Sequence, residues 1–161
     1  MSIDYYKSVI DLVGETPQVQ ISDAITGSRA PVLAKVEYFN PGLSIKDRIA
    51  INIILQAEKD GKIGPGATII ESTSGNTGVG LAIMSAVRGY RCICVMNTSH
   101  SPEKIKLLKA YGAEIEICDG KVKREHPTSS YSRAKELNAT IPNSFLIDQY
   151  SNKLNPGTHR D

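Results

Sequence analysis

The stretch ATIIESTSGNTGVGLAIMSAVRGYRCICVM, residues 67–96, contains a complete strand–loop–helix–strand unit. Its first five residues, 67–71, have the apolar pair Ile69 and Ile70 at their centre and predict a strand. Small and apolar residues through 79–87 then predict a helix, which Gly89 closes. Residues 91–96 predict a second buried strand. Two buried strands joined by a helix are typical of parallel pairing, so this unit predicts an α/β protein.

The same alternation continues on both sides of this unit. We expect further helices over 4–13, from Ser44 to near Gly61, from Ser101 to Gly112 and around 131–138, and further strands over 32–37, 114–118 and 144–147. The first helix is expected to be capped by Asp4 and stopped by Gly14. Ser44 and Asp47 resemble a capping box with Asp in place of Glu. The predicted fold class is a parallel sheet flanked by helices.

Composition excludes several function classes. The chain has 161 residues, 40% hydrophobic and 22% charged, which suits one globular core. A net charge of +2 gives no reason to expect a nucleic-acid partner. The sequence has no apolar run long enough for a membrane span and no signal peptide, so we expect a cytoplasmic protein. The basic cluster of Lys121, Lys123 and Arg124 is expected to be a solvated loop.

The cysteines and histidines are spaced unlike a metal site or a disulfide framework. Cys92 and Cys94 alternate within one predicted strand, so both face the same side and are poor partners for each other. Cys118 and the three histidines are scattered singly, and there is no CxxC pair. We therefore expect no metal.

The loop 71–78, Glu-Ser-Thr-Ser-Gly-Asn-Thr-Gly, is a candidate anion site. Small hydroxylated residues and glycines ahead of a helix allow backbone N–H groups to converge on a carboxylate or phosphate. No lysine follows as a P-loop requires, and the glycines at 75, 78 and 80 do not follow the dinucleotide order G-x-G-x-x-G. From the spacing alone, the loop could instead be an ordinary helix cap that binds no ligand.

A second loop, residues 40–48, reads Asn-Pro-Gly-Leu-Ser-Ile-Lys-Asp-Arg. With Ser44 as the N-cap, Lys46 takes the second position of the helix, where the helix dipole favours the neutral amine. A neutral amine is the form that condenses with an aldehyde, although Asp47 opposes this effect. Without further context, a lysine at a helix start is most often a solvated charge.

Together these segments resemble the cysteine synthase and cystathionine β-synthase family of pyridoxal-phosphate (PLP) enzymes. Asn40 to Arg48 resembles the family's lysine motif, and Thr73 to Gly78 its substrate-carboxylate loop. Further similar stretches lie at 15–17, 88–92, 111–114, 148–152 and 155–156. The resemblance covers essentially the whole chain, and several motifs in order are more specific than any one.

The resemblance implies a role for each matching residue. Lys46 would bond covalently to PLP and act as base and acid at the substrate Cα, and Asn76 would contact the 3′ oxygen of PLP. The implied ligands of the amino acid's α-carboxylate are Thr73, Ser74, Gly75, Asn76, Thr77 and Gln149. The implied reaction is β-replacement on serine, O-acetylserine or a similar amino acid by a thiol or sulfide, giving cysteine or cystathionine. A full-length homodimer is also implied.

The resemblance also implies a domain arrangement and several departures. Residues 1–37 would be an arm of a large domain, 38–147 a small α/β domain, and 148–161 the start of the return into the large domain. Leu43 stands where the family usually has glycine, and Arg160 where it has an aromatic residue. The family's glycine-rich loop for the PLP phosphate lies beyond Asp161, so we expect this stretch alone to bind PLP weakly and to be inactive.

Two alternatives remain open from sequence. A derived, non-catalytic module would keep the carboxylate loop and bind an amino acid or a peptide C-terminus without turnover. Within the enzyme reading, residues 87–92 and 148–150 favour the cystathionine β-synthase side, but cysteine synthase and a synthase that uses another nucleophile are also compatible.

Overall fold

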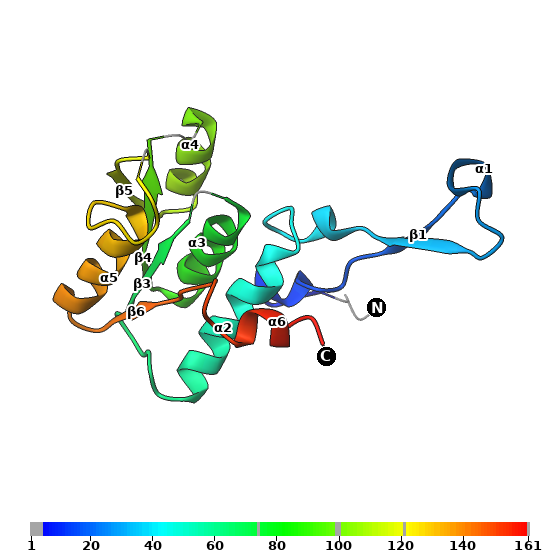
Figure 1. The fold of residues 1–161 in the computed structure, drawn as a ribbon. Helices are drawn as coiled ribbons and strands as arrows, with labels where there is room; N and C mark the ends of the chain where they lie inside the picture. The colour runs from blue at the N-terminus through cyan, green and yellow to red at the C-terminus, as the bar shows by residue number, and fades with distance from the viewer. Residues whose placement is uncertain (1–4, 74, 99–100, 121, 161) are drawn as a thin grey trace.

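The computed structural model describes residues 5–73, 75–98, 101–120 and 122–160. Its centre is a four-stranded sheet in the order β5-β4-β3-β6 (Figure 1). The strands are β3 (Thr68–Ser72), β4 (Arg91–Asn97), β5 (Glu114–Cys118) and β6 (Ser144–Leu146). All three pairings are parallel, which confirms the predicted α/β fold class.

Helices cover both faces of this sheet, as expected from its buried strands. They are α2 (Lys46–Lys59), α3 (Asn76–Arg88), α4 (Pro102–Ala110) and α5 (Ser130–Thr140). Helix α5 lies on one face, and α2, α3 and α4 lie on the other (Figure 1). Each of these helices was predicted. Pro102 occupies the first turn of α4, where its missing N–H leaves no helical hydrogen bond unmade.

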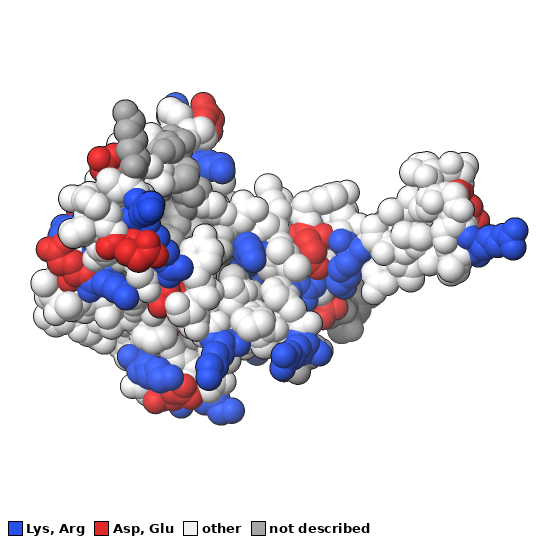
Figure 2. Space-filling model, in the orientation of Figure 1, with Lys and Arg blue, Asp and Glu red and all other residues white. Residues whose placement is uncertain are grey.

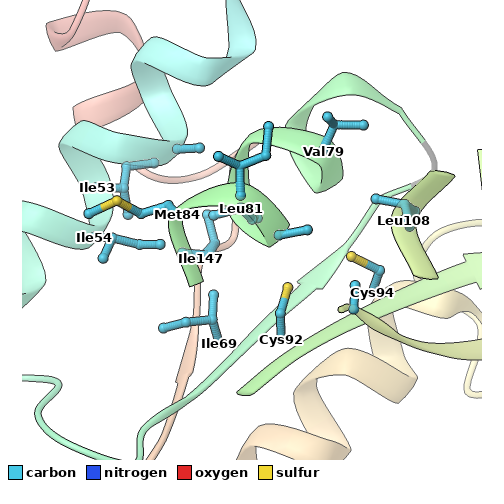
Figure 3. Close-up of a cluster of buried hydrophobic side chains, with 14 of the residues drawn as sticks. Ile53, Ile54, Ile69, Val79, Leu81, Met84, Cys92, Cys94, Leu108 and Ile147 are labelled. Carbon is cyan, nitrogen blue, oxygen red and sulfur yellow. The ribbon is translucent and has the colours of Figure 1, made fainter. Parts of the chain in front are cut away.

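The core divides into two clusters because neighbouring strand residues face opposite sides. Ile69 packs with α2 and α3 in the larger cluster, whereas Ile70 packs with Ala134 of α5. Cys92 and Cys94 both belong to the larger cluster, as their spacing predicted, and both are buried free thiols (Figure 3). The sheet is thereby fixed between two helical layers.

An arm projects from this body and carries a hairpin that the sequence analysis missed. Strand β1 (Gln18–Ile21) pairs with β2 (Val32–Lys35) in antiparallel register, and the short helix α1 (Asp23–Thr26) lies at the tip (Figure 1). The strand predicted over 32–37 is therefore confirmed for Val32–Lys35, but it pairs in an antiparallel hairpin and not in the parallel sheet. The strand ends at Lys35 because the chain turns into a 3-10 segment, η2 (Glu37–Phe39).

The predicted helix over 4–13 is also wrong. Only a 3-10 turn forms, η1 (Val9–Leu12), and Ser8 caps it through a capping box with Asp11. Asp4, the predicted cap, lies outside the described residues. Ile10 packs against the core, but Tyr5 and Tyr6, ahead of η1, are 73% and 60% exposed and bury no apolar face. An isolated helix of this length is not stable without such packing.

Helix α2 begins differently from the expected capping box. Its N-cap is Ile45 and not Ser44, so the helix begins one residue later than predicted. Lys46 is therefore the first helical residue and not the second. The Ser44 hydroxyl does accept a hydrogen bond from the Lys46 N–H, at 3.1 Å. The Asp47 carboxylate, however, accepts from the Gly42 N–H rather than from Ser44, because the loop folds back over the helix start. Asp47 thus holds the loop closed.

The chain ends with a short helix, α6 (Leu154–Gly157), which packs against α2. The Asn52 side chain on α2 donates to the Thr158 hydroxyl at 2.8 Å. Within the described ranges, no helix has the length and apolar character that a membrane crossing needs.

Candidate functional site

One cavity of about 600 Å³ opens at the carboxyl ends of β3 and β4. The starts of α2, α3 and α5 also contribute to its wall, which is where parallel α/β sheets bind ligands. The lining residues are Lys46, Ser72, Thr73, Gly75, Asn76, Thr77, Val95, Met96, Asn97, Asp119, Val122, Arg124, Ser129, Ser130, Tyr131, Gln149 and Tyr150. Its volume is in the range of cavities that hold small molecules.

Lys46 lines this cavity from the first position of α2. Its side chain is half-buried, and no described residue forms an ion pair or hydrogen bond with its amine. Other basic side chains do form salt bridges, for example Arg48 with Glu37 and Lys62 with Asp60. The amine is therefore available to a ligand in the same space as the predicted carboxylate loop.

The carboxylate loop follows β3 and ends at the start of α3. Of the residues predicted from sequence, Thr73, Gly75, Asn76 and Thr77 all line the cavity. Ser74 lies outside the described residues. Gly75 is the N-cap of α3 and provides no side chain to bond the first helical N–H groups. These N–H groups and the positive end of the helix dipole therefore favour an anion at this position.

Gln149 joins the loop through a buried chain of hydrogen bonds. The Thr77 hydroxyl donates to Gln149 Oε1 at 2.7 Å, and Gln149 Nε2 donates to Glu71 Oε1 at 3.1 Å. Asn155 donates to the Gln149 carbonyl at 2.8 Å. The Gln149 amide is thus held in one orientation beside the cavity.

Glu71 was not identified as a site residue from sequence. Its carboxyl is 2% exposed, and its Oε2 atom has no hydrogen-bond partner among the described residues. Burial raises the pKa of Glu71 to about 7, and the charge of Asp148 acts in the same direction. The protonation of this carboxyl therefore changes in the neutral range, directly behind Gln149.

The lysine loop is packed closely against α2 and α3. A Cβ on Gly42 would lie 2.3 Å from Asp47 Oδ1, so only glycine fits beside that carboxylate. Burial raises the pKa of Asp47, and the hydrogen bond from the Gly42 N–H acts in the opposite direction. A Cβ on Gly80 would lie 2.9 Å from the Ala50 Cβ. Glycine at 80 thus permits the close approach of α3 to α2 that brings the two site loops together.

Arg48, two residues after the lysine, anchors the loop to the arm. Its guanidinium donates twice to Glu37, at 2.8 and 2.9 Å, and also to the Gly14 carbonyl and the Thr16 hydroxyl. The hydrogen bonds from Arg48 lower the pKa of Glu37 to about 2. The stretch at 15–17 and the lysine motif, noticed separately in the sequence, therefore meet in one polar network.

The prediction that Arg124 is part of a solvated loop is wrong. Arg124 lines the cavity, and its guanidinium carbon lies 3.9 Å from the centre of the Tyr131 ring. Tyr131 is seven residues away on α5, so local sequence shows no aromatic interleaving. Lys123 is exposed as expected, and Lys121 lies outside the described residues.

The two sequence departures lie away from the cavity lining. Leu43 is 70% exposed and does not line the cavity, so its side chain does not narrow it. Arg160 is exposed and likewise absent from the lining residues. Within the described ranges, no three or more His, Cys, Asp and Glu side chains are grouped as a metal site would require.

Comparisons with known proteins agree with this geometry. A family model described as pyridoxal-phosphate dependent enzyme matches residues 9–160. A probable cysteine synthase of Bacillus subtilis is 47% identical over 150 residues, which cover 93% of this chain and 47% of that protein. The cystathionine beta-synthase of Oryctolagus cuniculus is 46% identical over 155 residues, covering 95% of this chain and 28% of that protein.

Solved structures show the same relationship. A hydrogen sulfide-producing enzyme from Fusobacterium nucleatum superposes with a TM-score of 0.87 and 40% identity, over 97% of this chain and 50% of that one. An O-ureido-L-serine synthase gives 0.86 and 38%, over 98% and 48%. The chain thus spans about half the length of these solved relatives. Since the family model covers nearly all of it, the chain belongs to the family of pyridoxal-phosphate dependent enzymes.

Proposed function

We propose that this chain provides the lysine and the substrate-carboxylate loop of a site for β-replacement on an amino acid such as serine or O-acetylserine. The nucleophile would be a thiol or sulfide, and the product cysteine or cystathionine. One observation carries the proposal: Lys46, with no partner for its amine among the described residues, shares a cavity with the open start of α3. The relatives named cysteine synthase and cystathionine beta-synthase support the same reaction class.

The residues of the cavity suit PLP and an amino acid together. PLP supplies, when bound, an aldehyde and a ring that withdraws electrons from the amino acid's Cα. Lys46 would hold the aldehyde and then remove and return the proton at Cα, a role that requires an amine with no competing ion pair. Asn76 would contact the 3′ oxygen of PLP. A volume of about 600 Å³ accommodates both molecules.

The α-carboxylate would bind at the start of α3. Its ligands would be the N–H groups and hydroxyls of 73–77, Ser74 included, with the Gln149 amide beside them. Thr77 and Glu71 fix the orientation of Gln149, so this part of the site is organised before a ligand arrives. A fixed carboxylate in turn orients the Cα–H bond toward a base.

We further propose that residues 1–37 and 148–161 belong to a larger domain and 38–147 to a smaller one. The arm supports this division, because its hairpin strands pair only with each other among the described residues. A glycine-rich phosphate loop would complete the PLP site in a longer protein. A cytoplasmic homodimer is part of the same proposal.

The test of this function is covalent labelling of the lysine. The protein is incubated with excess PLP, reduced with borohydride and digested, and the modified lysines are mapped by mass spectrometry. We expect the label on Lys46, and we expect added L-serine to change its yield. Lys59, at the other end of α2, is the matched control and should be labelled weakly and independently of serine.

Two results would contradict the enzyme reading in different ways. Equal labelling of Lys46 and Lys59 would show that the Lys46 amine is an ordinary surface amine. Absence of label together with measurable serine binding would favour a non-catalytic module that binds an amino acid or a peptide C-terminus. One observation supports that alternative: Thr77, Gln149 and the start of α3, which would hold a carboxylate, do not depend on Lys46 for their arrangement.

A further inference from the structure

Another part of the cavity wall carries a second cation that the proposed reaction does not use. Arg124 lines the cavity with its guanidinium 3.9 Å from the ring centre of Tyr131 and 4.9 Å from that of Tyr150. Such cation–π contacts fix a planar guanidinium while leaving its edge free for hydrogen bonds. Arg124 is therefore held in place at the cavity rather than extended into solvent.

The hydrogen bonds of Arg124 leave donors free. Its NH2 group donates to Asp148 Oδ1 at 3.3 Å, which is long for a charged pair. Its Nε is buried and has no hydrogen-bond partner among the described residues. A guanidinium has five N–H donors in a fork that matches a carboxylate or phosphate. The Nε is covered, but the Arg124 side chain as a whole is 37% exposed and lines the cavity, so the remaining N–H groups at the end of the guanidinium can reach a ligand oxygen.

The arginine is coupled to the carboxylate site through two consecutive residues. Asp148 accepts from Arg124 and from the Tyr131 hydroxyl, while Gln149 bonds Thr77 and Glu71. The backbone of Asp148 is left-handed, with φ 47°. The side chains of Asp148 and Gln149 bond different partners. The start of α3 and Arg124 are both positive and border the same cavity. They are linked to each other through the consecutive residues Gln149 and Asp148.

We propose that Arg124 binds a second acidic group, so that the site prefers reactants with an anion beyond the α-carboxylate. The acidic group would belong either to the β-substituent of the amino acid or to the incoming thiol. This inference rests on the proposed function, because it assumes that an α-carboxylate occupies the start of α3. It adds a class of substrate: acidic rather than neutral partners.

The first experiment compares ligands that differ only in charge. Binding of L-glutamate and L-glutamine is measured by isothermal titration calorimetry, since the two have nearly the same size. We expect the chain to bind L-glutamate about tenfold more tightly, as a charged hydrogen bond at Arg124 provides. In Arg124→Gln this preference for L-glutamate over L-glutamine should disappear. Arg133→Gln, on α5 and paired with Glu116 and Glu136, is the matched control.

A second variant changes affinity in the opposite direction. Asp148→Asn removes the anion that competes for Arg124 and keeps a residue type that tolerates a left-handed backbone. L-glutamate should bind this variant more tightly than the parent, and L-glutamine should bind equally. This result does not depend on Arg124→Gln folding. If Asp148→Asn binds both ligands as the parent does, Arg124 serves only to hold the loop and the inference is wrong.

The source of the acidic group is separated by a pair of thiols. The binding of 3-mercaptopropionate is compared with the binding of 2-mercaptoethanol, both in the presence of L-serine. A preference for the acid that Arg124→Gln abolishes assigns the group to the thiol, and a preference limited to L-glutamate assigns it to the β-substituent.

Failure of the proposed function looks different: L-glutamine and L-serine would then not bind at all, or Thr77→Val would leave their binding unchanged. Binding of both amino acids with equal affinity would overturn the arginine inference alone.

Discussion

Leu43 has φ 61° and is one of three described residues other than glycine with a positive φ. The left-handed region is unfavourable for residues with a Cβ by about 1–2 kcal/mol. The Leu43 side chain is 70% exposed, so little packing compensates for this strain. The glycine that the family resemblance leads us to expect at this position is thus explained by the backbone conformation, not by the size of the cavity.

We expect Leu43→Gly to stabilise the protein by about 1 kcal/mol, since glycine adopts this φ without strain. Thermal unfolding should show a rise of about 2–4 °C for a chain of this size. Leu43→Ala is the control, because it removes most of the same side chain but keeps the Cβ. Equal shifts for the two variants would show that side-chain exposure, and not the backbone, is responsible.

Glu71 should make stability depend on pH. Its pKa of about 7 lies above that of an unfolded glutamate, so the folded protein holds the proton more tightly. The contribution of Glu71 to the free energy of unfolding is complete below about pH 4.5. It is lost as the pH rises to about 7, which lowers the free energy of unfolding by up to about 3 kcal/mol. Urea unfolding at several pH values should show this decline in the parent protein and not in Glu71→Gln. Glu103→Gln, at an exposed position, should retain it.

At the scale of elements, the contact between α2 and α3 determines where the two loops lie. Gly80→Ala would place a Cβ 2.9 Å from the Ala50 Cβ and 3.1 Å from the Asp47 Cα. Overpacking of this kind destabilises by about 1–3 kcal/mol, partly offset by the better helix propensity of alanine. We expect a net loss of about 1–2 kcal/mol in chemical denaturation and weaker PLP labelling of Lys46.

The control for this variant is Gly64→Ala. A Cβ there meets no atom within 4 Å, and Gly64 has no positive φ. Its unfolding free energy should stay within about 0.5 kcal/mol of the parent, as at ordinary surface positions. A similar loss in both variants would refute the role of the α2–α3 contact.

The elements of the body were predictable because their signals are local. Strands β3 and β4 are apolar runs bounded by glycine, and α4 begins at Ser-Pro-Glu. The hairpin was missed because Gln18–Ile21 is a short alternation with three exposed residues and pairs across a connection of ten residues. The helix predicted over 4–13 did not form, because Tyr5 and Tyr6 at its start are exposed and propensity alone does not stabilise a first turn that buries no apolar face.

The site was predictable where its residues lie in recognisable motifs. Lys46, Thr73, Gly75, Asn76, Thr77 and Gln149 were predicted from such motifs, and all of them line the cavity. Glu71 and Arg124 were missed, because their importance comes from contacts with residues 78 and 24 positions away. Nothing in the adjacent sequence of either residue indicates those partners.

At the scale of the whole molecule, the protein is a packed body with a projecting arm (Figure 1). The middle of the arm surface carries few charges between its tip and its base (Figure 2). Val19 and Leu33 on the hairpin strands are 53% and 58% exposed, and Ile25 at the tip is 80% exposed. A two-stranded hairpin with so little burial is only marginally stable.

Hydrogen exchange should therefore divide the molecule into two parts. We expect the amides of β1 and β2 to exchange at least about 100-fold faster than those of β3 and β4, because opening the hairpin breaks few contacts. Mass spectrometry of peptic fragments measures this difference, with α5 as a reference within the body. Equal protection of hairpin and sheet would mean that the arm is held by contacts absent from the isolated chain, such as those of a self-associated form.

The burial of two of the three cysteines has a practical consequence. Cys92 and Cys94 are 5% and 0% exposed, whereas Cys118 is partly exposed at the end of β5, next to the cavity-lining Asp119. Burial raises the pKa of the Cys118 thiol, so a maleimide dye would attach slowly and mainly there at mildly alkaline pH. The native protein thus has one natural attachment point for a fluorophore, beside the mouth through which a ligand would enter.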